Sequence, residues 1–140
     1  MKWFKTLRWP TGEAYLRRWM LTPEANSGRK CPWRLYLHNI VRPDHGRHPH
    51  DHPSWFVTIV LRGGYVEAVF DDRGRFVRTE RRRRGQVIYR PATYVHRIVS
   101  VDRGTWTLSL WGRYTRQWGF YVDGQFMPEY AYPRTPEQME

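Results

Sequence analysis

The sequence predicts a single all-β domain built from short antiparallel strands, and three observations lead to this prediction. The chain has 140 residues, which is enough for one domain with a full core and too few for two. Segments rich in β-branched and aromatic residues recur about every ten residues, as they do in β-sandwiches and barrels. The 11 glycines and 10 prolines are scattered between those segments, which suits many short turns.

The N-terminal part of the chain is predicted to contain a helix and then the first strand. Residues 1–33 mix basic and aromatic side chains, and Tyr15, Leu16 and Trp19 fall at helical spacing, so we expect a helix over residues 12–20. From residue 34 the period changes to that of strands, and residues 35–41 form the first predicted strand. We therefore expect residues 1–33 to be a short extension packed on the outside of a domain that begins at residue 34.

The other predicted strands follow one another closely. Residues 55–61 give the strongest signal, because they are β-branched and aromatic and lie between Pro53 and a Gly-Gly pair. Further strands are predicted over residues 65–70, 75–78, 86–90, 95–101 and 106–111. The four arginines at 81–84 are interpreted as an exposed connection, and the sequence assigns them no role. We place the main domain at residues 34–127 and a loosely held tail at residues 128–140.

Charge and cysteine content narrow the partners and the compartment. The net charge of +11 suits an anionic partner, such as nucleic acid or a carboxylate, but it also suits a solvated basic surface. No nucleic-acid motif accompanies the charge, so the solvated surface is favoured. The single cysteine, Cys31, allows no internal disulfide, and no apolar stretch reaches signal-peptide or transmembrane length. We therefore expect a cytoplasmic protein without a membrane partner.

The histidines form the clearest functional signal in the sequence. Five of the six lie within residues 38–52, and neutral imidazole is the commonest side-chain ligand of transition metals. In a strand, residues two apart project from the same face about 6.6 Å apart along the chain, so their rings can meet at one ion, whereas residues four apart cannot do so along a straight strand. The residues therefore allow either His48 with His50, or His50 with His52, as a chelating pair.

The spacing after this pair resembles the first motif of the cupin superfamily. That motif has His-x-His, then a glutamate, then a glycine after six further residues. With His50 and His52 as the pair, Phe56 stands at the glutamate position and Gly63 at the glycine position. The resemblance selects this pair over the alternative one, and it implies that the fourth protein ligand of the motif is missing.

The second cupin motif is matched downstream. Gly85 and Pro91 stand at its glycine and proline positions, His96 stands at its ligand position, and Ser100 replaces its asparagine. The resemblance therefore implies an antiparallel double-stranded β-helix, or jelly-roll barrel, that holds one divalent transition metal by His50, His52 and His96. Three protein ligands leave coordination positions open, as catalytic metal sites require.

Strand alternation and the resemblance together suggest which residues surround the metal. The side chains expected to face the cavity are those of Phe56, Thr58, Tyr94, Ile98 and Ser100. Three further residues are candidates to support the ligands. Asp51 would be an orienting or turn residue, Glu67 would either hydrogen-bond a histidine or pair with a surface arginine, and His48 would lie in a loop near the mouth.

Two functions fit these features. A three-histidine cupin site resembles that of the thiol dioxygenases, which implies a non-haem oxygenase acting on a small molecule that could carry an anionic group. Fe(II) is the favoured metal, and Mn, Ni, Cu or Zn are the alternatives. Position 56 is Phe, so the cysteine that cysteine dioxygenases crosslink to tyrosine is absent and cysteine is not the expected substrate.

The alternative function is a metal-supported binding module without turnover. Residues 50–53, 60–65, 105–108 and 117–120 are similar to small cupin-like proteins of phage and bacterial genomes, so such a module could be phage-associated. A barrel without metal is the third hypothesis. Aromatic residues outside the motifs, among them Trp3, Trp9, Trp19 and Trp118, suggest an exposed apolar patch and hence a homodimer.

Overall fold

The computed structural model describes residues 3–9, 11–22, 33–43 and 48–132. All paired strands within these ranges are antiparallel, which confirms the predicted all-β class. The strands are β1 (Phe4–Arg8), β2 (Ala14–Met20), β3 (Arg34–Ile40), β4 (Phe56–Arg62), β5 (Gly64–Phe70), β6 (Phe76–Arg83), β7 (Val87–Arg90), β8 (Val95–Val101), β9 (Thr105–Trp111), β10 (Gly119–Val122) and β11 (Gln125–Pro128). A short 3₁₀ helix, Glu129–Ala131, follows them. The described residues contain no helix long and apolar enough to cross a membrane.

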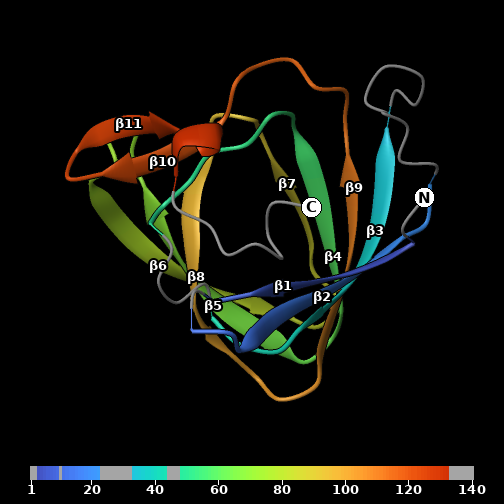
Figure 1. Cartoon of the computed structure of the whole chain (residues 1–140). Helices are drawn as coiled ribbons and strands as arrows, with labels where there is room; N and C mark the ends of the chain where they lie inside the picture. Colours follow the sequence, from blue (N-terminus) through green and yellow to red (C-terminus); the bar gives the residue numbers. More distant parts are fainter. Residues whose placement is uncertain (1–2, 10, 23–32, 44–47, 133–140) are drawn as a thin grey trace.

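Two sheets form the walls of a barrel. The larger has the strand order β1-β2-β3-β9-β4-β7, and the smaller has the order β6-β5-β8. Figure 1 shows them on opposite sides of the interior, with the β10–β11 hairpin beside the smaller sheet. The chain passes from the larger to the smaller sheet at Gly63, whose φ is +70° and where an added Cβ would lie 2.5 Å from Thr105 Oγ1. Only glycine fits this crossing, because it has neither the Cβ nor the steric penalty at positive φ.

The predicted helix over residues 12–20 is wrong, because this segment is strand β2. Its positions also fit a period of two: Leu16, Arg18 and Met20 align with Ile40, His38 and Tyr36 of β3. The local sequence is compatible with the spacing of a helix or of a strand, and pairing with β1 and β3 selects the strand. Residues 4–20 therefore add two strands to the larger sheet, and the domain boundary at residue 34 stays a prediction.

The interpretation of the arginine run at 81–84 as an exposed connection is also wrong for most of its length. Strand β6 extends to Arg83, because its backbone pairs with β5 as far as Gly64. The run therefore lies in an edge strand, and alternation turns Arg82 toward the interior, where its Nε donates to Glu67. The β10–β11 hairpin also has no counterpart among the predicted strands.

The apolar core and the histidines lie toward different ends of the barrel. Ile40, Val60 and Tyr65 form the core cluster, next to the connection between β4 and β5. Strand β4 runs from there back to Phe56, whose ring lies 4.4 Å from that of His52. The cavity of the site described below extends from the histidines to Ile40 and Tyr65 of this cluster.

The outer face of the larger sheet is apolar across five strands. Directly paired positions give one row of Trp19, Leu37, Leu108, Ile59 and Val87, and a second row of Leu35, Leu110, Val57 and Tyr89. These side chains alternate with the buried ones that face the barrel interior, and Val87 and Tyr89 are 67% and 64% exposed. These two rows therefore form a contiguous apolar surface on the outer face of the described sheet.

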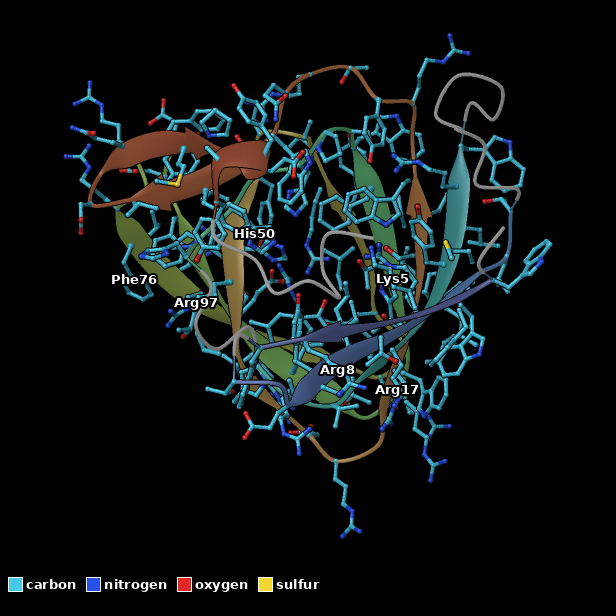
Figure 2. The ribbon with its side chains drawn as sticks, in the orientation of Figure 1. Lys5, Arg8, Arg17, His50, Phe76 and Arg97 are labelled. Atoms are coloured by element: carbon cyan, nitrogen blue, oxygen red, sulfur yellow. The ribbon has the colours of Figure 1, made fainter. Side chains whose placement is uncertain are left out.

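We expect two copies of the chain to pair through this face, because a large contiguous apolar patch is typical of an interface and the same patch on each copy can be self-complementary. Replacing both Val87 and Tyr89 by Lys should shift the protein toward monomer without unfolding it, since both positions are exposed. Phe76→Lys is the matched control, because Phe76 is 60% exposed on the opposite sheet (Figure 2). Sedimentation equilibrium checks the expectation, and a wild-type protein that stays monomeric at micromolar concentration would contradict it.

Candidate metal centre

Three buried histidines meet inside the barrel. His96 lies on β8, and His50 forms isolated bridges to His96 and to Phe120 of β10. The backbones of His50 and His96 exchange two N–H···O hydrogen bonds, each 3.1 Å long. Residues that exchange both bonds in an antiparallel pair present their side chains on the same face. His52, two residues after His50, completes the group, and one ring nitrogen from each residue lies within 4.8 Å of the others.

The Nδ1 atoms of these histidines are directed away from the common point. His52 Nδ1 donates to the carbonyl oxygen of Tyr94 over 3.0 Å, and His96 Nδ1 donates to Glu67 Oε1 over 2.6 Å. His50 Nδ1 makes a longer contact of 3.5 Å with the carbonyl oxygen of His48. Acceptors of this kind fix the tautomer of a ligand histidine and make its other nitrogen available to a metal.

The geometry of the inner nitrogens fits a bound cation. The Nε2 atoms of His52 and His96 are 3.2 Å apart. In neutral rings whose Nδ1 atoms donate to these acceptors, both Nε2 atoms direct a lone pair at the same region, where a cation could bind both. Two nitrogens bound to one metal at about 2.0–2.1 Å are separated by roughly 3.0–3.4 Å. The donor set and its spacing therefore suit a transition metal.

Glu67 connects the site to a buried ion-pair network. It is fully buried, and its Oε2 accepts from Arg90 Nη2 and from Arg82 Nε. Arg90 also donates to Thr58 and Tyr65, over 2.8 Å and 3.0 Å. Burial alone would raise the pKa of Glu67, but the hydrogen bond from His96, followed by the charge of Arg90, lowers that pKa well below its ordinary value. Glu67 is therefore a carboxylate that accepts from His96, with two arginines balancing its charge.

Asp51 and His48 lie outside the cluster. Asp51 is buried on the far side of the strand, where it accepts from the backbone N–H of Gly119 over 2.8 Å and pairs with Arg116 at 2.9 Å. It thus holds the start of β10 against the histidine segment. His48 is exposed, and its Nδ1 lies 2.8 Å from the hydroxyl oxygen of Tyr132. His45 lies outside the described residues.

A cavity of about 380 Å³ opens onto the three histidines. Of the predicted cavity residues, Phe56, Thr58 and Ile98 line it, whereas Tyr94 and Ser100 are not among its lining residues. Glu67 pairs with Ile98 and Val66 pairs with Ser100, so β8 contains one extra residue at that point, and Ser100 is exposed. Such a bulge interrupts the alternation on which the prediction for Ser100 depended.

Tyr94 instead lies beside the ion-pair network. Its hydroxyl accepts from Arg82 over 3.3 Å, and its ring centroid is 5.4 Å from the guanidinium carbon of Arg90. Its backbone carbonyl is the acceptor for His52. Tyr94 therefore supports a ligand through its backbone.

Phe56 makes the wall beside His52 apolar. Its ring stacks on Trp111 with centroids 4.3 Å apart and an interplanar angle of 9°.

The cavity is also lined by residues that were not singled out from the sequence, among them Arg34, Trp111 and Phe120. Alternation from Thr107 through Ser109 could have indicated Trp111. No sequence signal places Phe120 there, because its position depends on the pairing of β10 with the histidine segment. Figure 2 shows His50 inside the barrel and Arg17 projecting outside it.

Comparisons with known proteins support the fold. The sequence matches no protein-family model, and no curated protein is significantly similar to it. Among solved structures, the polyketide cyclase RemF from Streptomyces resistomycificus aligns with a TM-score of 0.60 and 18% identity, over 89% of this chain and 82% of that one. A cupin-like protein from Thermotoga maritima aligns with a TM-score of 0.56 and 18% identity, over 79% of this chain and 78% of that one. KdgF from Halomonas sp. aligns with a TM-score of 0.54 and 14% identity, over 74% of this chain and 84% of that one.

These likenesses extend over most of each chain at low identity, so they concern the fold. They agree with the two antiparallel sheets of this chain. The resemblance based on the two sequence motifs is confirmed at this level. The chain therefore has the antiparallel double-stranded β-helix fold of cupin-like proteins.

Proposed function

We propose that this protein is a metal-dependent enzyme that acts on a small molecule in the barrel, and more specifically a non-haem oxygenase. The observation that carries the proposal is the convergence of three buried histidines on a cavity large enough for a small substrate, with the Nδ1 atoms of His52 and His96 held by hydrogen bonds. A metal bound there with three protein ligands would supply open coordination positions and, as Fe(II), redox chemistry with dioxygen.

The residues of the chain would contribute binding and orientation. His50, His52 and His96 would hold the metal, while Glu67 keeps the His96 ring oriented. Phe56 occupies the place where the cupin motif has a glutamate, so one side of the site is apolar and offers no fourth ligand. This arrangement favours Fe(II), with Mn, Ni, Cu and Zn as alternatives.

The test begins with the metal content of purified protein and of protein reloaded with each metal. Oxygen consumption is then measured for the Fe(II)-loaded protein with a panel of small carboxylates, ketones and phenols. Substrate-dependent oxygen uptake that is lost in His96→Ala would support the oxygenase. Turnover of a panel member without oxygen uptake would favour non-oxidative chemistry, such as that of the polyketide cyclase that shares the fold. Metal retention with ligand binding and no turnover would favour a binding module.

A further inference from the structure

The cavity contains a buried arginine for which the described part of the chain provides no carboxylate partner. Arg34, at the start of β3, is only 6% exposed and lines the same cavity as the histidines. Its Nη2 donates to Ser54 Oγ over 3.3 Å and to the carbonyl oxygen of Gly112 over 2.9 Å. Both acceptors are neutral. Within the described residues no Asp or Glu forms an ion pair with Arg34.

The other buried arginine among the described residues, Arg90, has a carboxylate partner. That partner is Glu67, which also pairs with the half-buried Arg82. Removing an arginine from water without a counter-charge is costly, and a guanidinium has five N–H donors to satisfy. The Nη2 of Arg34 is bound to neutral acceptors. An anion in the cavity would accept hydrogen bonds from the other N–H groups of this side chain and would neutralise its charge.

The surroundings of Arg34 restrict where that anion can lie. The ring of Tyr114 lies 4.3 Å from the guanidinium carbon, and that of Trp111 lies 5.9 Å from it. The Trp111 ring is in turn 5.5 Å from His52. Arg34 is thus separated from the histidine cluster by one aromatic side chain, and aromatic faces hold the planar guanidinium in place.

The charge of the residues that line the cavity also favours an anionic ligand. Among the described residues that line it are Lys5 and Arg18 as well as Arg34 and Arg90, and there is no Asp or Glu. Arg90 is matched by a carboxylate behind the wall, whereas Arg34 is held by neutral groups. Phe56, Trp111 and Phe120 make much of the remaining surface apolar. Such a lining suits a molecule with one anionic group and an apolar body.

We infer that Arg34 is the anion-binding residue of the cavity and that the ligand is a small organic carboxylate with an apolar body. The planar guanidinium matches a carboxylate, and the charge-assisted hydrogen bonds that result are among the stronger ones in proteins. The inference rests on the proposed function only in placing the ligand beside the metal. The anion itself is assigned from the buried charge of Arg34.

Binding of benzoate, measured by tryptophan fluorescence and calorimetry, tests this inference. The titrations use Zn²⁺-loaded protein, which has no redox turnover, and protein prepared without added metal. Wild-type protein should bind benzoate at least about 10-fold more tightly than the neutral analogue benzamide, and Arg34→Gln should weaken benzoate binding by about 10- to 100-fold. Arg34→Lys, which keeps a positive charge but not the planar fork, should fall between them.

Arg17→Gln is the matched control, because Arg17 lies outside the barrel and donates to Asn39 (Figure 2). It removes the same charge and should leave benzoate binding unchanged. Circular dichroism verifies the fold of each variant, and the comparison of benzoate with benzamide in wild type needs no variant at all.

Three outcomes would overturn the inference: benzamide binding as tightly as benzoate, Arg34→Gln binding benzoate like wild type, or inorganic phosphate competing as well as benzoate does. Benzoate that binds only to the metal-loaded protein, and equally to Arg34→Gln, would place the anion on the metal. Failure of the proposed function would instead appear as absent metal or absent turnover, while the dependence of benzoate binding on Arg34 would remain.

Discussion

Replacing His96 by Ala should abolish most metal retention. His96 supplies one of three converging nitrogens, and the two histidines that remain cannot hold a divalent ion as three do. After gel filtration in metal-free buffer, the metal content measured by atomic emission should fall from about one equivalent per chain to near zero. The fold should survive, because the backbone hydrogen bonds of residue 96 to His50 do not depend on the ring.

His48→Ala is the control for that result. His48 is exposed and its ring contacts Tyr132, so its loss should leave the metal content nearly unchanged. His45→Ala, outside the described residues, is expected to behave in the same way. If either variant lost metal as severely as His96→Ala, an upstream histidine would be a ligand and the assignment of the pair to His50 and His52 would be wrong.

Replacing Glu67 by Gln should weaken both the metal site and the fold. The glutamine amide could still accept from His96, but it carries no charge, so Arg90 would remain buried without a counter-ion. Breaking a buried pair in this way costs about 3–5 kcal/mol of unfolding free energy, and loss of the carboxylate behind a ligand histidine typically costs about 10- to 100-fold in metal affinity. Chelator competition and urea denaturation measure the two effects.

The matched control is Asp102→Asn. Asp102 forms an exposed ion pair with Arg81, and exposed pairs contribute no more than about 1 kcal/mol. It should therefore change the unfolding free energy little and the metal affinity not at all. A Glu67→Gln protein as stable as this control would show that Arg90 does not need the carboxylate.

The Glu67 carboxylate should make the stability of the metal-free protein fall as the pH is lowered. The pKa of Glu67 is lower in the folded protein than its ordinary value. A carboxyl of this kind stabilises the folded state above its unfolded pKa of about 4.3, and the contribution is lost as the pH falls from there toward the folded pKa. Denaturation curves below about pH 4 should therefore show a smaller loss of stability on acidification for Glu67→Gln than for wild type.

Much of this fold could be predicted because its determinants are local. Strand composition and regular turns indicated β3, β4, β5, β8 and β9 close to their observed limits, since each strand encodes its own alternation of buried and exposed residues. The histidine pair also has a local cause, because residues two apart on an extended chain share a face. The residues alone left two such pairs open, and the resemblance to the cupin motifs selected one of them.

Other features depended on pairing between distant segments. Residues 14–20 suit a helix or a strand by their own sequence, and pairing with the edge of β3 decides the outcome. Glu67 was assigned either to a histidine or to a surface arginine. In the structure it contacts His96 and Arg82, because β5 lies between β8 and β6, and it also contacts Arg90 of β7, which belongs to the opposite sheet.

Arg34 shows most clearly the difference between what the sequence determines and what only tertiary contacts determine. In the sequence it is one of many cations in a chain of net charge +11, and nothing distinguishes it from the solvated ones. Its burial, its neutral partners and its place in the wall of the histidine cavity arise only when β3 pairs with β9 and Trp111 packs beside it. The sequence by itself determined the strand rhythm and the types of candidate ligands. The tertiary structure decided which charges are neutralised and which are left facing the cavity, because burial and counter-charge depend on contacts between strands far apart in the chain.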